Sequence, residues 1–119
     1  MIGRTYPDLP VDWSVLMMLA DDDVDFAQEL LQIYVDDCGS YMESMGQAIV
    51  QGDYDRLYST AHYLKGSSSN VGAVGIVDAS HTLELLARSH CLGDAPALYG
   101  QIQQDVQRIS QWLQTRSLS

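Results

Sequence analysis

The chain has 119 residues, with sixteen acidic side chains, six Lys or Arg and a formal net charge of −10. This balance argues against binding to nucleic acids or anionic membranes, because both need a basic surface. No apolar run approaches the roughly 20 residues of a membrane span, and the N-terminus lacks a secretion signal. We therefore expect a single cytoplasmic domain over residues 1–119.

Hydrophobic periodicity predicts an all-α chain of five helices. Prolines stand only at positions 7, 10 and 96, so a long stretch between the last two is free to form helices. The predicted helices, in chain order, are 10–20, 22–51, 53–70, 73–89 and 94–116. Short connections favour an antiparallel up-and-down four-helix bundle, with the short N-terminal helix as an additional cover.

The second and longest predicted helix carries capping residues at both ends. Asp22 and Asp23 can accept hydrogen bonds from the first turn, and Gly52 suits a helix C-terminus. Its predicted core face consists of Phe26, Leu30, Ile33, Tyr34, Tyr41, Met45, Ala48 and Ile49. The many aspartates near its start are expected to form a solvated face and to cap helices.

Helical spacing also separates a buried stripe from a border row in the next two helices. The predicted stripe of the third helix is Leu57, Ala61, Leu64, Ser68 and Val71, and its border row is Tyr58, His62, Lys65 and Ser69. The fourth helix has the stripe Ile76, Ala79, Leu83 and Leu86, and the row Val77, His81, Glu84 and Arg88. An antiparallel pair of helices then sets His62 level with Glu84. The last helix has Leu98, Ile102, Val106, Ile109 and Leu113 for the core.

Residues 61–73 read Ala-His-Tyr-Leu-Lys-Gly-Ser-Ser-Ser-Asn-Val-Gly-Ala, which places a histidine, a cation and a glycine on one helix face. A neutral imidazole at His62 can accept a phosphoryl group. Lys65, the only lysine in the chain, can offset the resulting negative charge. Gly66 costs helix stability, and close approach by a partner would explain its presence.

This segment resembles the signature of histidine phosphotransfer (HPt) domains, roughly Ala-His-x-Leu-Lys-Gly-Ser-Ser-x-x-x-Gly-Ala. The likeness continues into Ser80-His81-Thr82-Leu83-Glu84-Leu85-Leu86, which is similar to the following helix of such domains. It covers roughly residues 20 to 115. The resemblance implies a helical bundle whose histidine receives phosphate from a histidine kinase or a phosphorylated receiver domain and passes it to a receiver aspartate.

The resemblance assigns roles to particular residues. His62 would be the phosphoacceptor, Lys65 would stabilise the phosphoryl charge, Gly66 would give access, and Glu84 would orient His62 through one ring nitrogen. Residues of secondary interest are Ser69, His81 and Arg88. Arg88 matches a second cation of some members, and it could equally form a salt bridge with Glu84 one turn earlier.

The same resemblance implies a phosphotransfer protein without kinase activity or a nucleotide site of its own. Receiver domains and a sensor or hybrid kinase would be its partners, and the receiver would supply Mg²⁺, so we expect no cofactor or metal in this chain. Docking is predicted around Trp13, Leu16, Met17 and Phe26. Five helices in one chain favour a monomer.

Two alternatives stay open. The bundle could bind receivers or kinases without transferring phosphate, or His62, His81 and Glu84 could form a metal site. Cys38 and Cys91 have no metal-type spacing and are expected to be free thiols.

Overall fold

The computed structural model describes residue 6 and residues 8–117, and within them every regular element is an α-helix. The helices are α1 (Trp13–Leu19), α2 (Val24–Gln51), α3 (Tyr54–Val71), α4 (Val74–Arg88) and α5 (Ala95–Ser117). The all-α prediction is confirmed. The first helix begins at Trp13 rather than at position 10, because the Asp12 side chain accepts a hydrogen bond from the Ser14 amide and caps the helix there.

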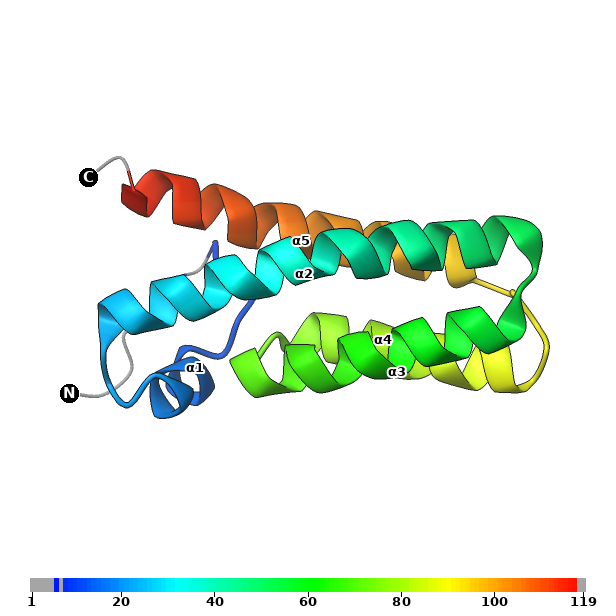
Figure 1. Cartoon of the computed structure of the whole chain (residues 1–119), viewed down its shortest axis with the longest axis horizontal. Coiled ribbons are helices and arrows are strands. Elements are labelled where there is room, and N and C mark those ends of the chain that lie inside the picture. The colour runs from blue at the N-terminus through cyan, green and yellow to red at the C-terminus, as the bar shows by residue number, and fades with distance from the viewer. Residues whose placement is uncertain (1–5, 7, 118–119) are drawn as a thin grey trace.

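The bundle has two pairs of neighbouring helices. Figure 1 shows α2 beside α5 along one side and α3 beside α4 along the other, and α3 and α4 make the most extensive contact. At 1.5 Å per residue, α2 is about 42 Å long and α3 about 27 Å, so the long pair extends past the short pair. The short helix α1 lies at that end, beside the N-terminal part of α2 and the C-terminal end of α3.

Gly72 joins α1 to the end of α3. Its φ of +79° is left-handed, and the following amide of Ala73 donates to the Ser68 carbonyl, which ends the helix. The Asp12 amide in turn donates to the Gly72 carbonyl at 2.7 Å. A Cβ at position 72 would lie 2.8 Å from the Asp12 carbonyl oxygen, so only glycine permits both the turn and this contact.

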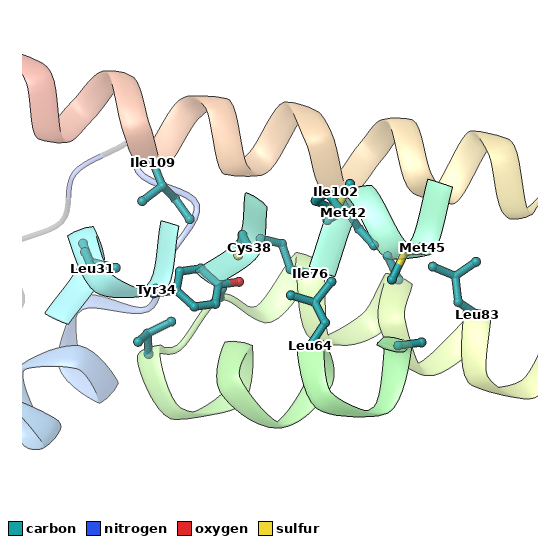
Figure 2. Close-up of a cluster of buried hydrophobic side chains, with 14 of the residues drawn as sticks. Leu31, Tyr34, Cys38, Met42, Met45, Leu64, Ile76, Leu83, Ile102 and Ile109 are labelled. Carbon is teal, nitrogen blue, oxygen red and sulfur yellow. The ribbon is translucent and has the colours of Figure 1, made fainter. Parts of the chain in front are cut away.

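The core runs the length of the bundle between the two helix pairs (Figure 2). In α3 the predicted stripe is confirmed, since Leu57, Ala61, Leu64, Ser68 and Val71 are all buried. In α4 and α5 the predicted core positions are also buried, except that Leu86, Leu98 and Val106 are only partly covered.

The predicted core face of α2 was partly wrong. Phe26 and Ile33 are exposed, and the buried residues are Ala27, Leu31, Tyr34, Cys38, Met42, Met45 and Ala48. These positions repeat every three or four residues without a break, so they form one straight seam toward the rest of the bundle. Phe26 and Ile33 each precede a seam residue by one position, which rotates them about 100° toward solvent.

A buried polar contact ties α2 to α3 inside this core. The hydroxyl groups of Tyr34 and Ser68 lie 2.6 Å apart, and both residues are buried. Burial raises the pKa of Tyr34, so the phenol stays protonated. Cys38 lies one turn along α2, and burial raises the pKa of its thiol to about 11. Cys38 and Cys91 are both free, as predicted.

Replacing Tyr34 with Phe should lower the free energy of unfolding by about 1–2 kcal/mol, because the Ser68 hydroxyl loses its buried partner. The double variant Tyr34→Phe/Ser68→Ala should recover part of that loss, since neither polar group is then left unpaired. Chemical denaturation followed by circular dichroism measures both. Simple addition of the two single effects would contradict a direct Tyr34–Ser68 interaction.

Iodoacetamide at pH 8 should modify Cys91 in the folded protein and leave Cys38 intact. Cys91 is exposed, whereas Cys38 is buried and has almost no thiolate at that pH. Both should react in denaturant, which serves as the control. Peptide mass spectrometry identifies the modified residues, and rapid native labelling of Cys38 would show that α2 opens away from the core.

Candidate functional site

The candidate site lies on the border between α3 and α4. Asp53 caps α3 by accepting a hydrogen bond from the Arg56 amide. The Arg56 side chain also donates to Ser44 and Gln47 of α2, which fixes the start of α3 on the bundle. Two turns further along, His62 points away from the buried stripe, and its side chain is 58% exposed.

His62, Lys65 and Glu84 meet across the two helices, as the antiparallel arrangement predicts. Lys65 Nζ lies 2.8 Å from Glu84 Oε1, and His62 Nδ1 lies 3.7 Å from the same oxygen. The lysine contact is an ion pair. The histidine contact is longer than a hydrogen bond. Glu84 therefore faces the ring nitrogen while its nearest cation is Lys65.

Burial gives this cluster its electrostatic character. The Glu84 side chain is only 8% exposed, whereas Lys65 is 28% exposed and His62 is mostly in solvent. A carboxylate removed from water needs a positive partner, and Lys65 supplies it. Because Nδ1 of His62 faces the carboxylate, Nε2 on the opposite side of the ring is directed away from Glu84 and is free to meet an incoming group.

Gly66 leaves open space beside His62. A Cβ built at this position would have no heavy atom within 4 Å, and the residue is exposed in the middle of α3. A close packing contact with another helix therefore does not explain this glycine. Ser69, on the same row, is also exposed and has a small side chain, so little side-chain bulk stands on this part of the helix surface next to His62. Such a surface can admit a bulky partner.

Arg88 contacts α3 at Tyr58, a residue of the predicted border row to which the sequence assigned no role. Its Nη2 donates to the Tyr58 hydroxyl at 3.0 Å, and its guanidinium lies 5.3 Å from the centre of the Tyr58 ring. The Arg88 side chain therefore contacts Tyr58 and does not form the salt bridge with Glu84 that its position one turn later would allow. The signal for Tyr58 in the sequence is its place on the border row, four residues before His62. His81, also of secondary interest, is exposed one turn before Glu84.

The predicted docking residues on α1 are covered to different degrees. Leu16 is fully buried, so its assignment to a docking surface was wrong. Trp13 is half-buried, because it packs edge-to-face against Tyr6 and Trp112 at 4.9 and 5.7 Å. Met17 is also partly buried against the core.

Phe26 remains available to a partner. It is 43% exposed, and Met18, which was not predicted, is 83% exposed. On α3 itself, the exposed Tyr63 packs edge-to-face on the His62 ring at 6.2 Å. Tyr63 is therefore an apolar surface residue directly beside the candidate phosphoacceptor.

The metal-site alternative finds no support in the geometry. Across residue 6 and residues 8–117, no three His, Cys, Asp or Glu side chains converge in a way that could hold a metal ion.

In that same part of the chain, none of the helices has the length and apolar character that crossing a membrane requires.

Comparisons with known proteins agree with this arrangement. Residues 29–112 match the family model described as Hpt domain. Histidine-containing phosphotransfer protein 2 of Arabidopsis thaliana is 39% identical over 65 residues, which cover 51% of this chain and 42% of that protein. The match thus spans less than half the length of the curated relative.

Two solved structures are similar over most of their length. The crystal structure of histidine-containing phosphotransfer protein B (HptB) from Pseudomonas aeruginosa PAO1 is 33% identical, with a TM-score of 0.80 over 89% of this chain and 92% of that one. The HPT domain from the Hpt sensor hybrid histidine kinase of Shewanella is 20% identical, with a TM-score of 0.74, covering 89% of this chain and 95% of that one. The second likeness concerns the fold alone.

The fold and the site define a helical bundle that displays the exposed His62 beside an ion pair whose carboxylate, Glu84, is buried. Together with the match over residues 29–112, they show that the chain belongs to the Hpt domain family. The family is a phosphotransfer module rather than a kinase.

Replacing Gly66 with Ala should separate stability from access. The added methyl group meets no other atom, and alanine favours a helix interior, so the free energy of unfolding should rise by about 0.5–1 kcal/mol. If a partner needs the open space, phosphate transfer should nevertheless slow. Thermal denaturation and a transfer assay measure the two effects.

Gly100→Ala is the matched control. Gly100 lies in α5, which packs on α2 and α4, and a Cβ there also meets no atom within 4 Å. It should give a similar gain in stability without any change in transfer. Equal transfer by both variants would show that Gly66 is not needed for access.

Proposed function

We propose that this protein is a phosphorelay intermediate that accepts a phosphoryl group on His62 and transfers it to an aspartate of a receiver domain. The donor is a histidine kinase or a phosphorylated receiver. The observation that supports this most directly is the exposed His62 ring, whose Nδ1 faces the buried Glu84 carboxylate 3.7 Å away. The Hpt family membership and the likeness to HptB point to the same function.

The chemistry begins at His62 Nε2. Its lone pair attacks the phosphorus of the donor, so an N–P bond forms while the bond between phosphorus and the donor atom breaks. A neutral ring with its proton on Nδ1 is the form that can attack. Glu84 favours that form, because a carboxylate near Nδ1 stabilises the proton there and the positive charge that develops on the ring.

Lys65 has two anionic partners in this cycle. In the unphosphorylated protein it lies 2.8 Å from Glu84 Oε1. A phosphoryl group on the neighbouring turn offers a second set of anionic oxygens, with which an ammonium group on a flexible side chain can pair. After phosphorylation, the Lys65 ammonium group would therefore pair with both the Glu84 carboxylate and the phosphoryl oxygens. The carboxylate is then freer to hold the Nδ1 proton.

The remaining chemistry belongs to the partners. We propose that ATP is used by a separate kinase and that a receiver domain supplies the Mg²⁺ and the aspartate for onward transfer. Receivers and a sensor or hybrid kinase are the partners expected on the surface around His62, which includes Tyr63 and the low surface at Gly66. The protein would act in the cytoplasm, as a monomer whose bundle helices all come from one chain.

Transfer of radiolabelled phosphate from a phosphorylated receiver or kinase tests the proposal. The wild-type protein should acquire label that is lost in acid and retained in alkali, and His62→Gln should acquire none. His81→Gln is the matched control, because His81 is a second exposed histidine near Glu84. It should be labelled normally.

Two outcomes would contradict the proposal. Label on the His62→Gln variant would assign the phosphoacceptor to another residue. Receiver binding without label from any donor would indicate a module that binds partners without transferring phosphate.

A further inference from the structure

We propose that Tyr58 is a positioning residue for phosphotransfer, which holds the His62 ring and fixes Arg88 as a second cation near the phosphoryl group. The inference rests on the proposed function at His62. It adds a residue to that site and gives Arg88 a defined role.

Tyr58 contacts both groups directly. Its ring is stacked on the His62 ring, with centres 6.1 Å apart and planes within 7° of parallel. Its hydroxyl accepts the hydrogen bond from Arg88 Nη2 at 3.0 Å, and the guanidinium lies 5.3 Å from the ring centre. The tyrosine thus links the imidazole on its own helix to the guanidinium on α4.

The two contacts between α3 and α4 follow from the antiparallel packing of these helices. His62 of α3 faces Glu84 of α4, and Tyr58, four residues before His62, faces Arg88, four residues after Glu84. Each step of four residues is about one helical turn. Arg88 is therefore placed about one turn from the His62–Glu84 pair, on the opposite side of His62 from Lys65.

Tyr58 also decides which partner Arg88 takes. Residues four apart on a helix are neighbours, so Arg88 could pair with Glu84. The Glu84 oxygen already lies 2.8 Å from Lys65. By accepting the Arg88 hydrogen bond, Tyr58 keeps this guanidinium off the carboxylate. Glu84 remains shared between Lys65 and His62, and Arg88 remains available for an added anion.

The surroundings argue against a purely structural role for Tyr58. A groove of about 430 Å³ runs between the start of α3 and the end of α4, and its lining includes Tyr54, Tyr58, Arg88 and His90. Tyr58 packs partly against the core, and it also lines this open groove. In a chain with a net charge of −10 and six basic residues, two of those six flank one histidine. A phosphoryl dianion on His62 would meet positive charge from both sides.

The test is single-turnover transfer with Tyr58→Phe, Arg88→Gln and the double variant. Tyr58→Phe keeps the ring and removes only the hydrogen bond to Arg88. Each single variant should slow loading of His62 by about two- to tenfold, the range expected for one hydrogen bond. The double variant should be no slower than the slower single variant, because the hydroxyl acts through Arg88.

Further readouts separate positioning from folding or docking. Thermal stability and affinity for the unphosphorylated receiver should stay at the wild-type level in Tyr58→Phe, while the lifetime of the phosphohistidine shortens. Tyr54→Phe, in the same groove, is the matched control, since Tyr54 stacks on His90 rather than on His62. It should leave loading unchanged.

The inference would be overturned if Tyr58→Phe loads and keeps phosphate like the wild type, or if the single losses multiply in the double variant. Either result leaves phosphotransfer by His62 intact. Failure of the wild-type protein to acquire label would instead overturn the proposed function itself, so the two failures are distinguishable.

Discussion

Glu84 is the one charged side chain that the fold buries within the described part of the chain, and the site is organised around it. A buried carboxylate must have a cation nearby, and that cation, Lys65, comes from a different helix. The ion pair therefore depends on α3 and α4 keeping their register. The same register sets His62 Nδ1 opposite the carboxylate. Position of the ring and neutralisation of the carboxylate thus follow from one packing arrangement.

Several contacts away from the site hold that register. The turn at Gly72 ends α3 and ties it to α1 through the Asp12 amide. The Tyr34–Ser68 contact anchors α3 to α2, and Arg56 does the same near the start of the helix. With α3 held at both ends and α4 following after a short turn, His62 and Glu84 have little freedom to slide apart. The helices α2 and α5 are longer than α3 and α4. At the end where they extend past the shorter pair lies α1, and the aromatic side chains of Tyr6, Trp13 and Trp112 pack together.

The two sides of α3 have different tasks. One side is a buried, mostly apolar stripe that contributes to the core. The other side presents His62 to solvent, next to the open space at Gly66. Gly66 weakens the helix locally, and tertiary packing compensates because the stripe beneath it is continuous. Access at the surface is thereby combined with a rigid support, as a group-transfer site requires.

The sequence by itself determined the helices and the acceptor motif, because caps, glycine stops and a 3.6-residue period are local signals. It also predicted that His62 and Glu84 lie opposite each other, since a short turn between two helices makes them pack antiparallel. Only the tertiary structure decided which side of α2 is buried, because Phe26 and Ala27 differ by one position and neighbouring helices choose between them. It likewise decided that Leu16 is core and that Arg88 contacts Tyr58, since these contacts join residues far apart in the chain.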